Sequence, residues 1–477
     1  MAKKDNTIQI LNFQKGIGQS PYVGFEELRC LNVTDKPGIC YPNGALSKES
    51  VSVVVDRIIG TCVDGNNMYG FSNETYIDIY KYTGGICGTW TELSGQTASK
   101  INGIAFWKKY LIVLHSDGQM DATDDDGTSW NLLFDDFGDS VGYRCPSLIA
   151  SNNVLYFGRK NILNNLAEKD GQTFDPSSSA TFDLDTSYPS LDLPANVIIT
   201  NIVELGSKLL IGTRPEKTAD TSCYLFIWDK TSTSYEQIKI EEGGINYLVS
   251  DGNLAYIQAG KEGEWYITNG TSVEFLNKIP TALAQNADYN NPASCAMWRN
   301  KIYFAVDGNS IGSDFGVWSL DIRTNAISYE YIISTGETGI NDGVIIGTVT
   351  NVNDELVVTW EDEENASFGS DGVSSTGYTG DTAYLVSQYY QLAGPLDTLT
   401  SKRFDLNLAK PCGASDSVKV FYRTAQNETF TKQITGLTMG EDDQNKSITK
   451  SITRIKGIQF KIVLNGAAEL LNFEMTI

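Results

Sequence analysis

The chain has 477 residues, with 36 Lys and Arg against 59 Asp and Glu, and a formal net charge of −23. The acidity is confined to the middle, because residues 51–390 carry a net charge of −26 whereas residues 1–50 and 391–477 carry +1 and +2. A surface this acidic repels nucleic acid and anionic membrane, which argues against a general nucleic-acid-binding role for the central part. Protein contacts are electrostatically easiest at the near-neutral ends.

Two further features of the composition narrow the class of protein. No run approaches 18 consecutive apolar residues, and the first residues contain no apolar signal core, so we expect neither a membrane span nor a secretory signal. The eight cysteines are scattered singly with no CxxC pair, which predicts buried reduced thiols rather than a zinc site or a disulfide framework.

The first 50 residues predict an extended N-terminal arm. Residues 14–25 are rich in turn formers, and a second corner follows at Lys36-Pro37-Gly38, a composition that does not favour a helix. The segment also holds apolar anchors with which it can pack. The candidate residues for an assembly contact in this arm are Gly16, Ile17, Pro21, Tyr22 and Phe25.

Residues 51–390 contain a recurring pattern, in which a few polar residues precede a short run of β-forming residues. The equivalent position in the seven copies is occupied by Tyr69, Leu111, Leu155, Leu210, Ala255, Ile302 and Val357, at spacings of 42 to 55 residues. One four-stranded propeller blade takes about 40–50 residues. Each copy is flanked by other strand-like runs, and none shows helical periodicity. The sequence therefore predicts an all-β protein with a β-propeller of about seven blades.

One hairpin of the second copy resembles the Asp box that links the third and fourth strands of many propeller blades. The motif residues are Thr123, Asp125, Gly127, Ser129 and Trp130. In such a motif the Asp carboxylate bonds the N–H groups of the turn, Gly takes a positive φ, and the aromatic ring packs between sheets. We interpret this hairpin as structural.

The repeat stops near residue 390, and six strand-like runs follow between 404 and 477. Short strands at regular spacing with polar turns predict an antiparallel β-sandwich at 391–477. The expected domains are thus an arm at 1–50, a propeller at 51–390 and a sandwich at 391–477.

The sequence offers few groups for catalysis, and we predict no catalytic residue, cofactor or metal site. His115 is the only histidine, so any His-dependent triad would have to use it. The acidic run at 124–126 lacks the downstream Glu of a calcium loop, and a hairpin tip is the simpler interpretation. A glycoside hydrolase or sialidase-like enzyme remains an alternative, in which Arg144, Arg214 and Arg299 would converge on a carboxylate.

The two ends of the chain resemble a known family. The opening residues 15–22, followed by 29–33 and the corner at 36–38, resemble the start of tail hub and nozzle proteins from short-tailed, podovirus-like bacteriophages. The strands at 403–406, 457–462 and 471–477 resemble the C-terminal strands of the same proteins.

The resemblance implies a virion structural protein that is not an enzyme. Such a protein assembles in a ring, usually of six copies, and forms part of the channel through which DNA leaves. Its partners would be copies of itself and other tail proteins on the portal or adaptor side and on the distal or fibre side. DNA would be in contact only transiently, and the protein would be assembled in the cytoplasm of the host bacterium. The alternative of a receptor- or glycan-binding propeller on a phage particle stays open.

Overall fold

The computed structural model divides into two compact units, and each is described by itself. The larger unit comprises Ser47–Phe315 and Ile333–Gly372, and the smaller unit comprises Met1–Leu46, Gly316–Ile332 and Val373–Ile477. The residues that the structure describes are 7–10, 27–32, 39–48, 54, 56–73, 77–83, 88–96, 99–124, 126–136, 148–151, 153–184, 190–217, 222–260, 263–279, 295–306, 316–334, 344–362, 365–377, 383–392, 400–401, 403–453 and 455–476.

The larger unit is built from antiparallel sheets in which consecutive strands are neighbours. Its first sheet contains β6 (Gly60–Asp64), β7 (Asn67–Phe71), β8 (Ile79–Thr83) and β9 (Thr89–Leu93). The second sheet contains β10 (Ile101–Trp107), β11 (Tyr110–His115), β12 (Gln119–Thr123) and β13 (Asn131–Asp136). The third contains β14 (Leu148–Ser151), β15 (Val154–Arg159), β16 (Ile162–Glu168) and β17 (Phe182–Leu184), with β18 (Leu191–Asp192) beside β16. The fourth contains β19 (Val197–Leu205), β20 (Lys208–Pro215), β21 (Cys223–Trp228) and β22 (Glu236–Ile240), and the fifth contains β23 (Ile245–Ser250), β24 (Ala255–Ala259), β25 (Glu264–Thr268) and β26 (Val273–Lys278). The pair β27 (Cys295–Trp298) and β28 (Lys301–Val306) follows, and then β31 (Val344–Val352), β32 (Glu355–Asp362) and β33 (Ser367–Gly377).

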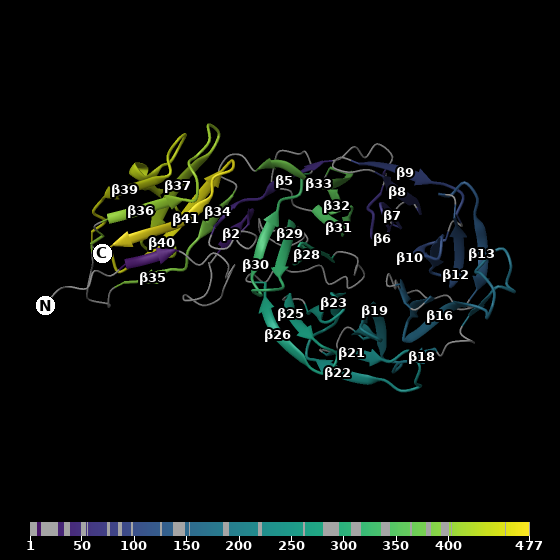
Figure 1. Cartoon of the computed structure of the whole chain (residues 1–477). Coiled ribbons are helices and arrows are strands. Elements are labelled where there is room, and N and C mark those ends of the chain that lie inside the picture. The colour runs from purple at the N-terminus through teal and green to yellow at the C-terminus, as the bar shows by residue number, and fades with distance from the viewer. Residues whose placement is uncertain are drawn as a thin grey trace. The chain divides into compact units, whose positions relative to one another are not determined.

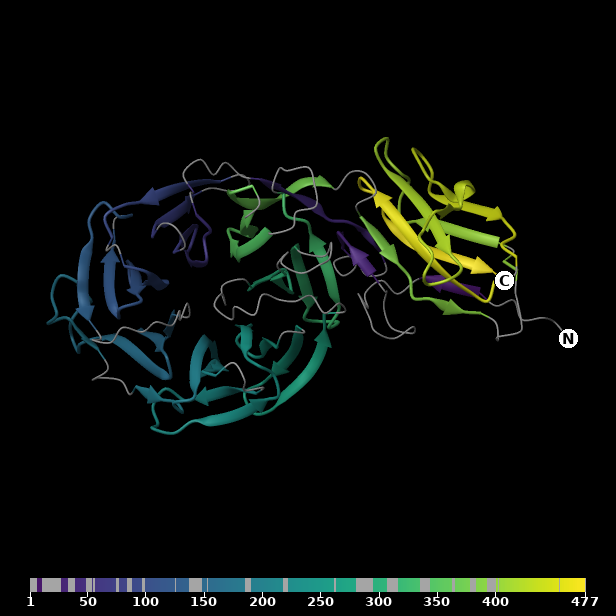
Figure 2. The ribbon, with the colours of Figure 1, turned by 180° about the vertical axis from the view of Figure 1, so that it is seen from behind.

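The first strands of these sheets lie beside one another in cyclic order. β6 contacts β10, β10 contacts β14, and the series continues through β19, β23 and β27 to β31, which contacts β6. Figures 1 and 2 show the same sheets following one another around a ring. The predicted all-β propeller fold is confirmed, while the blade number stays a prediction.

The seven repeat positions identified in the sequence all fall on the second strand of their sheets. Tyr69, Leu111, Leu155, Leu210, Ala255, Ile302 and Val357 lie on β7, β11, β15, β20, β24, β28 and β32, and all are buried. Because the sheets pack against their neighbours, most residues of these strands are buried, and β11 is buried at every residue. The core is therefore a series of layers between sheets rather than one central cluster.

Direct contacts between the last and the first sheet close the ring. The hydroxyl groups of Thr61 and Thr350 are 2.8 Å apart, and the Trp90 indole N–H donates to Ser370 Oγ at 2.9 Å. The Thr359 hydroxyl donates to the carbonyl oxygen of Ile58 at 3.0 Å. An apolar cluster with members on both sheets, including Tyr80, Tyr82, Trp90, Val352 and Val357, packs around these bonds.

Two larger sheets form most of the described part of the smaller unit. One has the order β1 (Thr7–Ile10), β41 (Leu470–Thr476), β36 (Arg403–Leu408) and β39 (Asn445–Thr449). The other contains β29 (Gly316–Asp321), β30 (Ile327–Tyr331), β2 (Glu27–Arg29), β34 (Tyr384–Val386), β40 (Gly457–Asn465), β37 (Ser417–Arg423) and β38 (Lys432–Gln433), with β35 (Tyr390–Gln391) paired to β40. Short strands β3 (Leu31–Asn32) and β4 (Tyr41–Pro42), which pair with each other, and a 3₁₀ turn at Thr435–Leu437 complete the smaller unit. The remaining strand, β5 (Gly44–Lys48), belongs to the sheet of β31, β32 and β33.

Aromatic side chains join the two sheets of the smaller unit. The rings of Phe460 and Phe473 have centroids 4.8 Å apart, and the Phe404 ring lies 6.4 Å from the Phe460 ring. The predicted sandwich at 391–477 stays a prediction, since the two sheets also take strands from residues 7–10, 27–29 and 316–331. The predicted three-domain boundaries likewise stay a prediction, and the structure groups the residues differently.

The close approach at the ring closure gives a first prediction. Gly347 lies at a bulge between β31 and β32, and a Cβ there would overlap the Ile58 carbonyl oxygen. Gly347→Ala should lower the free energy of unfolding of the larger unit by about 1–3 kcal/mol, as overpacking does. Chemical denaturation measures the change. Gly440→Ala is the control, because a Cβ at that position meets nothing within 4 Å and should leave stability nearly unchanged.

Candidate functional site

The two ends of the chain meet in the smaller unit. β1 pairs antiparallel with β41, from Thr7 opposite Thr476 to Ile10 opposite Phe473. Cys40 and Leu470 exchange two backbone hydrogen bonds of 2.9 and 2.8 Å. Residues 29–32 of the opening stretches that resemble phage tail proteins lie in the same unit, whereas residues 15–22 and 36–38 lie outside the described residues.

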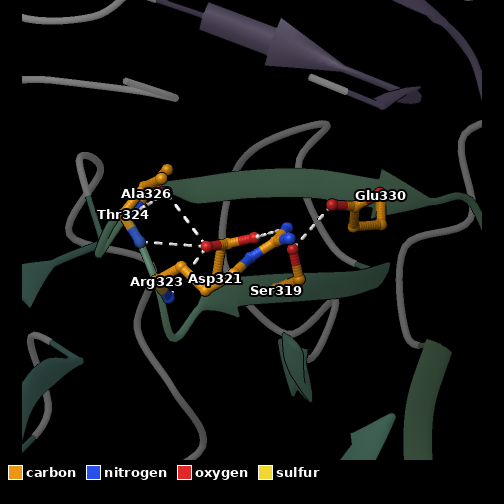
Figure 3. A network of polar contacts seen from close by, with 6 residues as sticks. All are labelled: Ser319, Asp321, Arg323, Thr324, Ala326 and Glu330. Atoms are coloured by element: carbon orange, nitrogen blue, oxygen red, sulfur yellow. Dashed lines mark hydrogen bonds and ion pairs between the residues drawn. The ribbon is translucent and has the colours of Figure 1, made fainter. Parts of the chain in front are cut away.

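The segment after β2 is fixed by a buried polar network. Glu330 on β30 is only 1% exposed, and its two carboxylate oxygens accept hydrogen bonds from Ser319 Oγ at 2.6 Å and from Asn43 Nδ2 at 2.5 Å. Figure 3 shows the Ser319–Glu330 contact between the neighbouring strands β29 and β30. Because a buried carboxylate is costly without partners, this network holds residue 43 firmly against β30.

The turn between β29 and β30 has its own buried carboxylate, also drawn in Figure 3. Asp321 Oδ1 accepts the backbone N–H groups of Arg323 and Thr324 at 2.9 and 3.0 Å, and Oδ2 pairs with the Arg323 guanidinium at 2.9 Å. Burial opposes ionisation of Asp321, but the guanidinium and the backbone donors outweigh it and lower its pKa. The hairpin is therefore locally rigid.

The structure does not describe the residues of the arm that were predicted to make assembly contacts. Gly16, Ile17, Pro21, Tyr22 and Phe25 lie outside the described residues. Their proposed role stays a prediction.

The predicted Asp-box hairpin connects β12 to β13 and contacts the first sheet. Gly127 N–H donates to Thr123 Oγ1 at 3.1 Å, and Gly127 has a φ of 79°. The Trp130 indole donates to the Ser94 carbonyl oxygen, beyond the end of β9, at 3.0 Å. Ser129 lies in the bend before Trp130, and Asp125 lies outside the described residues, so the assignment as an Asp box stays a prediction.

A polar cavity of about 210 Å³ lies beside this hairpin, between the first and second sheets. Asp126 receives the Tyr69 hydroxyl at 2.9 Å and the Lys81 ammonium at 2.7 Å, and Lys109 pairs with Asp124 at 2.5 Å. Burial, reinforced by Asp126, raises the pKa of Tyr69. Asp124 and Asp126 of the acidic run thus bind lysine ammonium groups, and Asp126 also accepts a phenol hydroxyl. The sequence did not reveal this cavity, because Tyr69 and Lys81 lie far from the hairpin along the chain.

His115 forms a fully enclosed pair with Asp121. The distance from His115 Nε2 to Asp121 Oδ2 is 3.0 Å, Nδ1 lies 3.0 Å from the Ser99 carbonyl oxygen, and both side chains are 0% exposed. A soluble substrate cannot touch this imidazole without rearrangement. The pair joins β11 to β12 and is best explained as structural.

Of the three arginines considered for an enzyme, the two that the structure describes lie at opposite ends of their sheets. Arg214 lies at the end of β20 farthest from the β19–β20 turn, where it faces Ile198. Arg299 lies in the β27–β28 turn, at the opposite end of its own sheet, and pairs with Asp354 at 3.1 Å. Arg144 lies outside the described residues.

Two acidic side chains, Glu242 and Glu264, lie close together between the fourth and fifth sheets. Glu242 follows β22, and burial first, then the neighbouring Glu264, raises its pKa, while Lys278 opposes the shift. The Tyr266 hydroxyl donates to Glu264 Oε2 at 2.5 Å. Cys223 lies close to Glu242, and burial raises the pKa of its thiol.

Among the described residues, no helix is long and apolar enough to cross a membrane, and no group of three or more His, Cys, Asp or Glu side chains is arranged to hold a metal ion.

Comparisons with known proteins give likeness in fold alone. No family model and no curated protein matches the chain. The WD40 β-propeller domain of Doa1 aligns with a TM-score of 0.44 and 11% identity over 70% of this chain and 98% of that chain. YCF48 bound to D1 peptide aligns with a TM-score of 0.43 and 8% identity over 70% and 96%. An exo-β-1,3-galactanase from Phanerochaete chrysosporium aligns with a TM-score of 0.32 and 8% identity over 91% and 99%. At these scores none of them carries an argument about function.

The buried network of the smaller unit gives a second prediction. Asn43→Ala removes one donor from the buried Glu330 carboxylate and should lower the free energy of unfolding of this unit by about 1–3 kcal/mol. Thermal and urea denaturation measure the change. Asn427→Ala is the control, since Asn427 is exposed. Equal stability of the two variants would show that the network does not hold residue 43.

The acidic pair gives a third prediction, on pH. Because the pKa of Glu242 is raised in the folded protein, the folded state holds the proton more tightly than the unfolded state does. The protonated Glu242 side chain therefore stabilises the folded state below the ordinary Glu pKa of about 4.3, and this stabilisation is lost as pH rises through the pKa of Glu242 in the folded protein. Glu242→Gln should gain stability relative to the parent between about pH 4 and pH 7. Denaturation across this range tests it.

The adjacent residue supplies the control for this experiment. Glu241 is exposed and pairs with Lys239 at 2.8 Å, so Glu241→Gln should keep the parent's pH dependence. A Glu242→Gln variant with the parent's pH profile would contradict the assignment.

Proposed function

We propose that this chain is a structural protein of a bacteriophage tail, of the hub or nozzle kind, which assembles as a ring of six copies. The observation that carries the proposal is the meeting of the two chain ends. More than 350 residues of sequence separate the opening stretches that resemble the phage proteins from the closing ones, yet residues 29–32 lie in the same unit as the strands at 403–406, 457–462 and 471–476, and β2, which ends at Arg29, pairs with β30 and β34. A shared terminal unit gives the resemblance a single structural location.

The charge distribution also supports this role. Residues 51–390 carry a net charge of −26, and a protein beside a DNA path must not retain phosphate groups. Release of counterions by Lys and Arg clusters drives non-specific DNA binding. The central part of this chain has 19 basic residues against 45 acidic ones, so it is unfavourable for such binding.

The proposed partners follow from the same role. Copies of the chain form the ring, other tail proteins contact it on the portal or adaptor side and on the distal or fibre side, and DNA passes transiently. The protein belongs to the virion and is assembled in the host bacterial cytoplasm. Its action is assembly and passage rather than catalysis, which agrees with an enclosed His115 and with arginines at opposite ends of their sheets.

Assembly state gives the fourth prediction. The purified chain, alone or mixed with the proteins encoded beside it, should form a ring with six times the 52.3 kDa mass of one chain. Size-exclusion chromatography with light scattering measures the mass, and negative-stain electron microscopy shows the ring. The ring should survive 0.5 M salt if its interfaces are mainly apolar. A strict monomer under every condition, including with its neighbours, would contradict the proposal.

A further inference from the structure

Residues 241–244 form a strap that covers a buried thiol. The strap connects β22, which ends at Ile240, to β23, which begins at Ile245. Cys223, the first residue of β21, pairs with Ile240 and so lies beside the start of the strap. Its side chain is 0% exposed, and the Gly244 backbone lies within hydrogen-bond reach of its sulfur. The connection between the fourth and fifth sheets therefore closes over Cys223.

A single side chain anchors the strap to the fifth sheet. The strap has the sequence Glu-Glu-Gly-Gly, in which Glu241 is exposed and pairs with Lys239 of its own sheet, and the glycines have no side chain. Glu242 is partly buried, and a Cβ added to Gly260 would overlap its carboxylate. The Gly260 N–H donates to the Gly244 carbonyl oxygen at 3.0 Å. The closed position of the strap thus depends on how the Glu242 carboxyl group fits against the β24–β25 turn.

A second carboxyl group faces this anchor. In the β24–β25 pair Glu264 lies opposite Ala259, at the start of the same turn, and its side chain lies beside Glu242. The Tyr266 hydroxyl donates to Glu264 Oε2 at 2.5 Å. Residues 261 and 262 of the turn lie outside the described residues. Two neighbouring carboxyl groups can share one proton, whereas two carboxylates repel each other. The strap is therefore attracted to the fifth sheet while that proton is present and repelled after it is lost.

The titratable groups described around Glu242 come from three strands. Burial raises the pKa of Glu242, Glu264 on β25 adds to this effect, and Lys278 on β26 opposes it. On β21, burial and then the charge of Glu242 raise the pKa of the Cys223 thiol to about 12, so the covered thiol stays protonated at neutral pH. Burial, followed by the hydrogen bond to Glu264, raises the pKa of Tyr266. The phenol and the thiol thus stay neutral while Glu242 changes its charge.

We propose that residues 241–244 are a pH-sensitive strap, which stays closed over Cys223 while Glu242 and Glu264 share a proton and opens when that proton passes to water. In the open strap Glu242 has the ordinary Glu pKa of about 4.3, so the open fraction rises with pH from there up to the pKa of the closed state. An uncovered thiol has an ordinary pKa of about 8.5 and reacts as the thiolate. A rise in pH therefore exposes a nucleophile that is concealed in acid. The strap acts within one chain and does not depend on the proposed ring.

Thiol labelling of the full chain tests the strap. N-ethylmaleimide is the probe, and mass spectrometry of the peptide that contains Cys223 gives the labelling rate at about pH 5 to 7.5, a range that lies above the ordinary Glu pKa. Glu242→Gln cannot ionise, and its amide N–H can still donate to Glu264, so its strap should stay closed. The ratio of the parent rate to the Glu242→Gln rate should rise by about threefold or more across this range. Because the two proteins are compared at the same pH, the reactivity of the uncovered thiol cancels. A ratio that does not change with pH would overturn the proposal.

Two matched variants and a second measurement separate opening of the strap from other causes. Glu264→Gln removes the facing charge and should also slow the labelling of Cys223 at the upper end of the pH range, whereas Glu241→Gln should label as the parent does. In hydrogen exchange of the parent, the Gly260 amide should lose protection as pH rises, after correction for its intrinsic rate. It should remain less protected than the fully buried strand β11 at every pH. Equal protection of Gly260 and β11 would mean that Cys223 is uncovered only when the whole unit unfolds, which contradicts a local strap.

Discussion

The contact between the first and last sheets is the constraint on which the larger unit depends. A row of sheets has two uncovered ends, and each uncovered end would expose the apolar face that the other sheets bury. Thr61 and Thr350 are separated by 289 residues and meet through their hydroxyl groups. The backbone at Ile58 approaches Gly347 so closely that no side chain fits between them. Such a long-range closure is also a slow step to reach in folding, because loop-closure entropy must be overcome before the contacts form.

Polar groups join neighbouring sheets elsewhere in the ring, and this explains how so acidic a unit can be compact. The Lys230 ammonium binds Glu204 and Ser151, which links the third and fourth sheets. Asp354 accepts the Trp298 indole N–H at 2.6 Å, which links β27 to the β31–β32 turn. Each link places a carboxylate of one sheet beside a donor of the next. Although exposed ion pairs contribute little individually, the links fix the angular position of each sheet relative to its neighbours.

The repeat could be predicted from the sequence because it depends on local pattern. A polar turn followed by an apolar strand places residues such as Leu155 and Leu210 at buried positions of the second strand, whatever lies around them. The smaller unit could not be predicted in the same way. The parallel pairing of β2 with β30 and the grouping of 316–332 with the chain ends depend on which distant segments meet. No local pattern encodes such a meeting, and buried Glu330 with Asn43 carries no sequence signature.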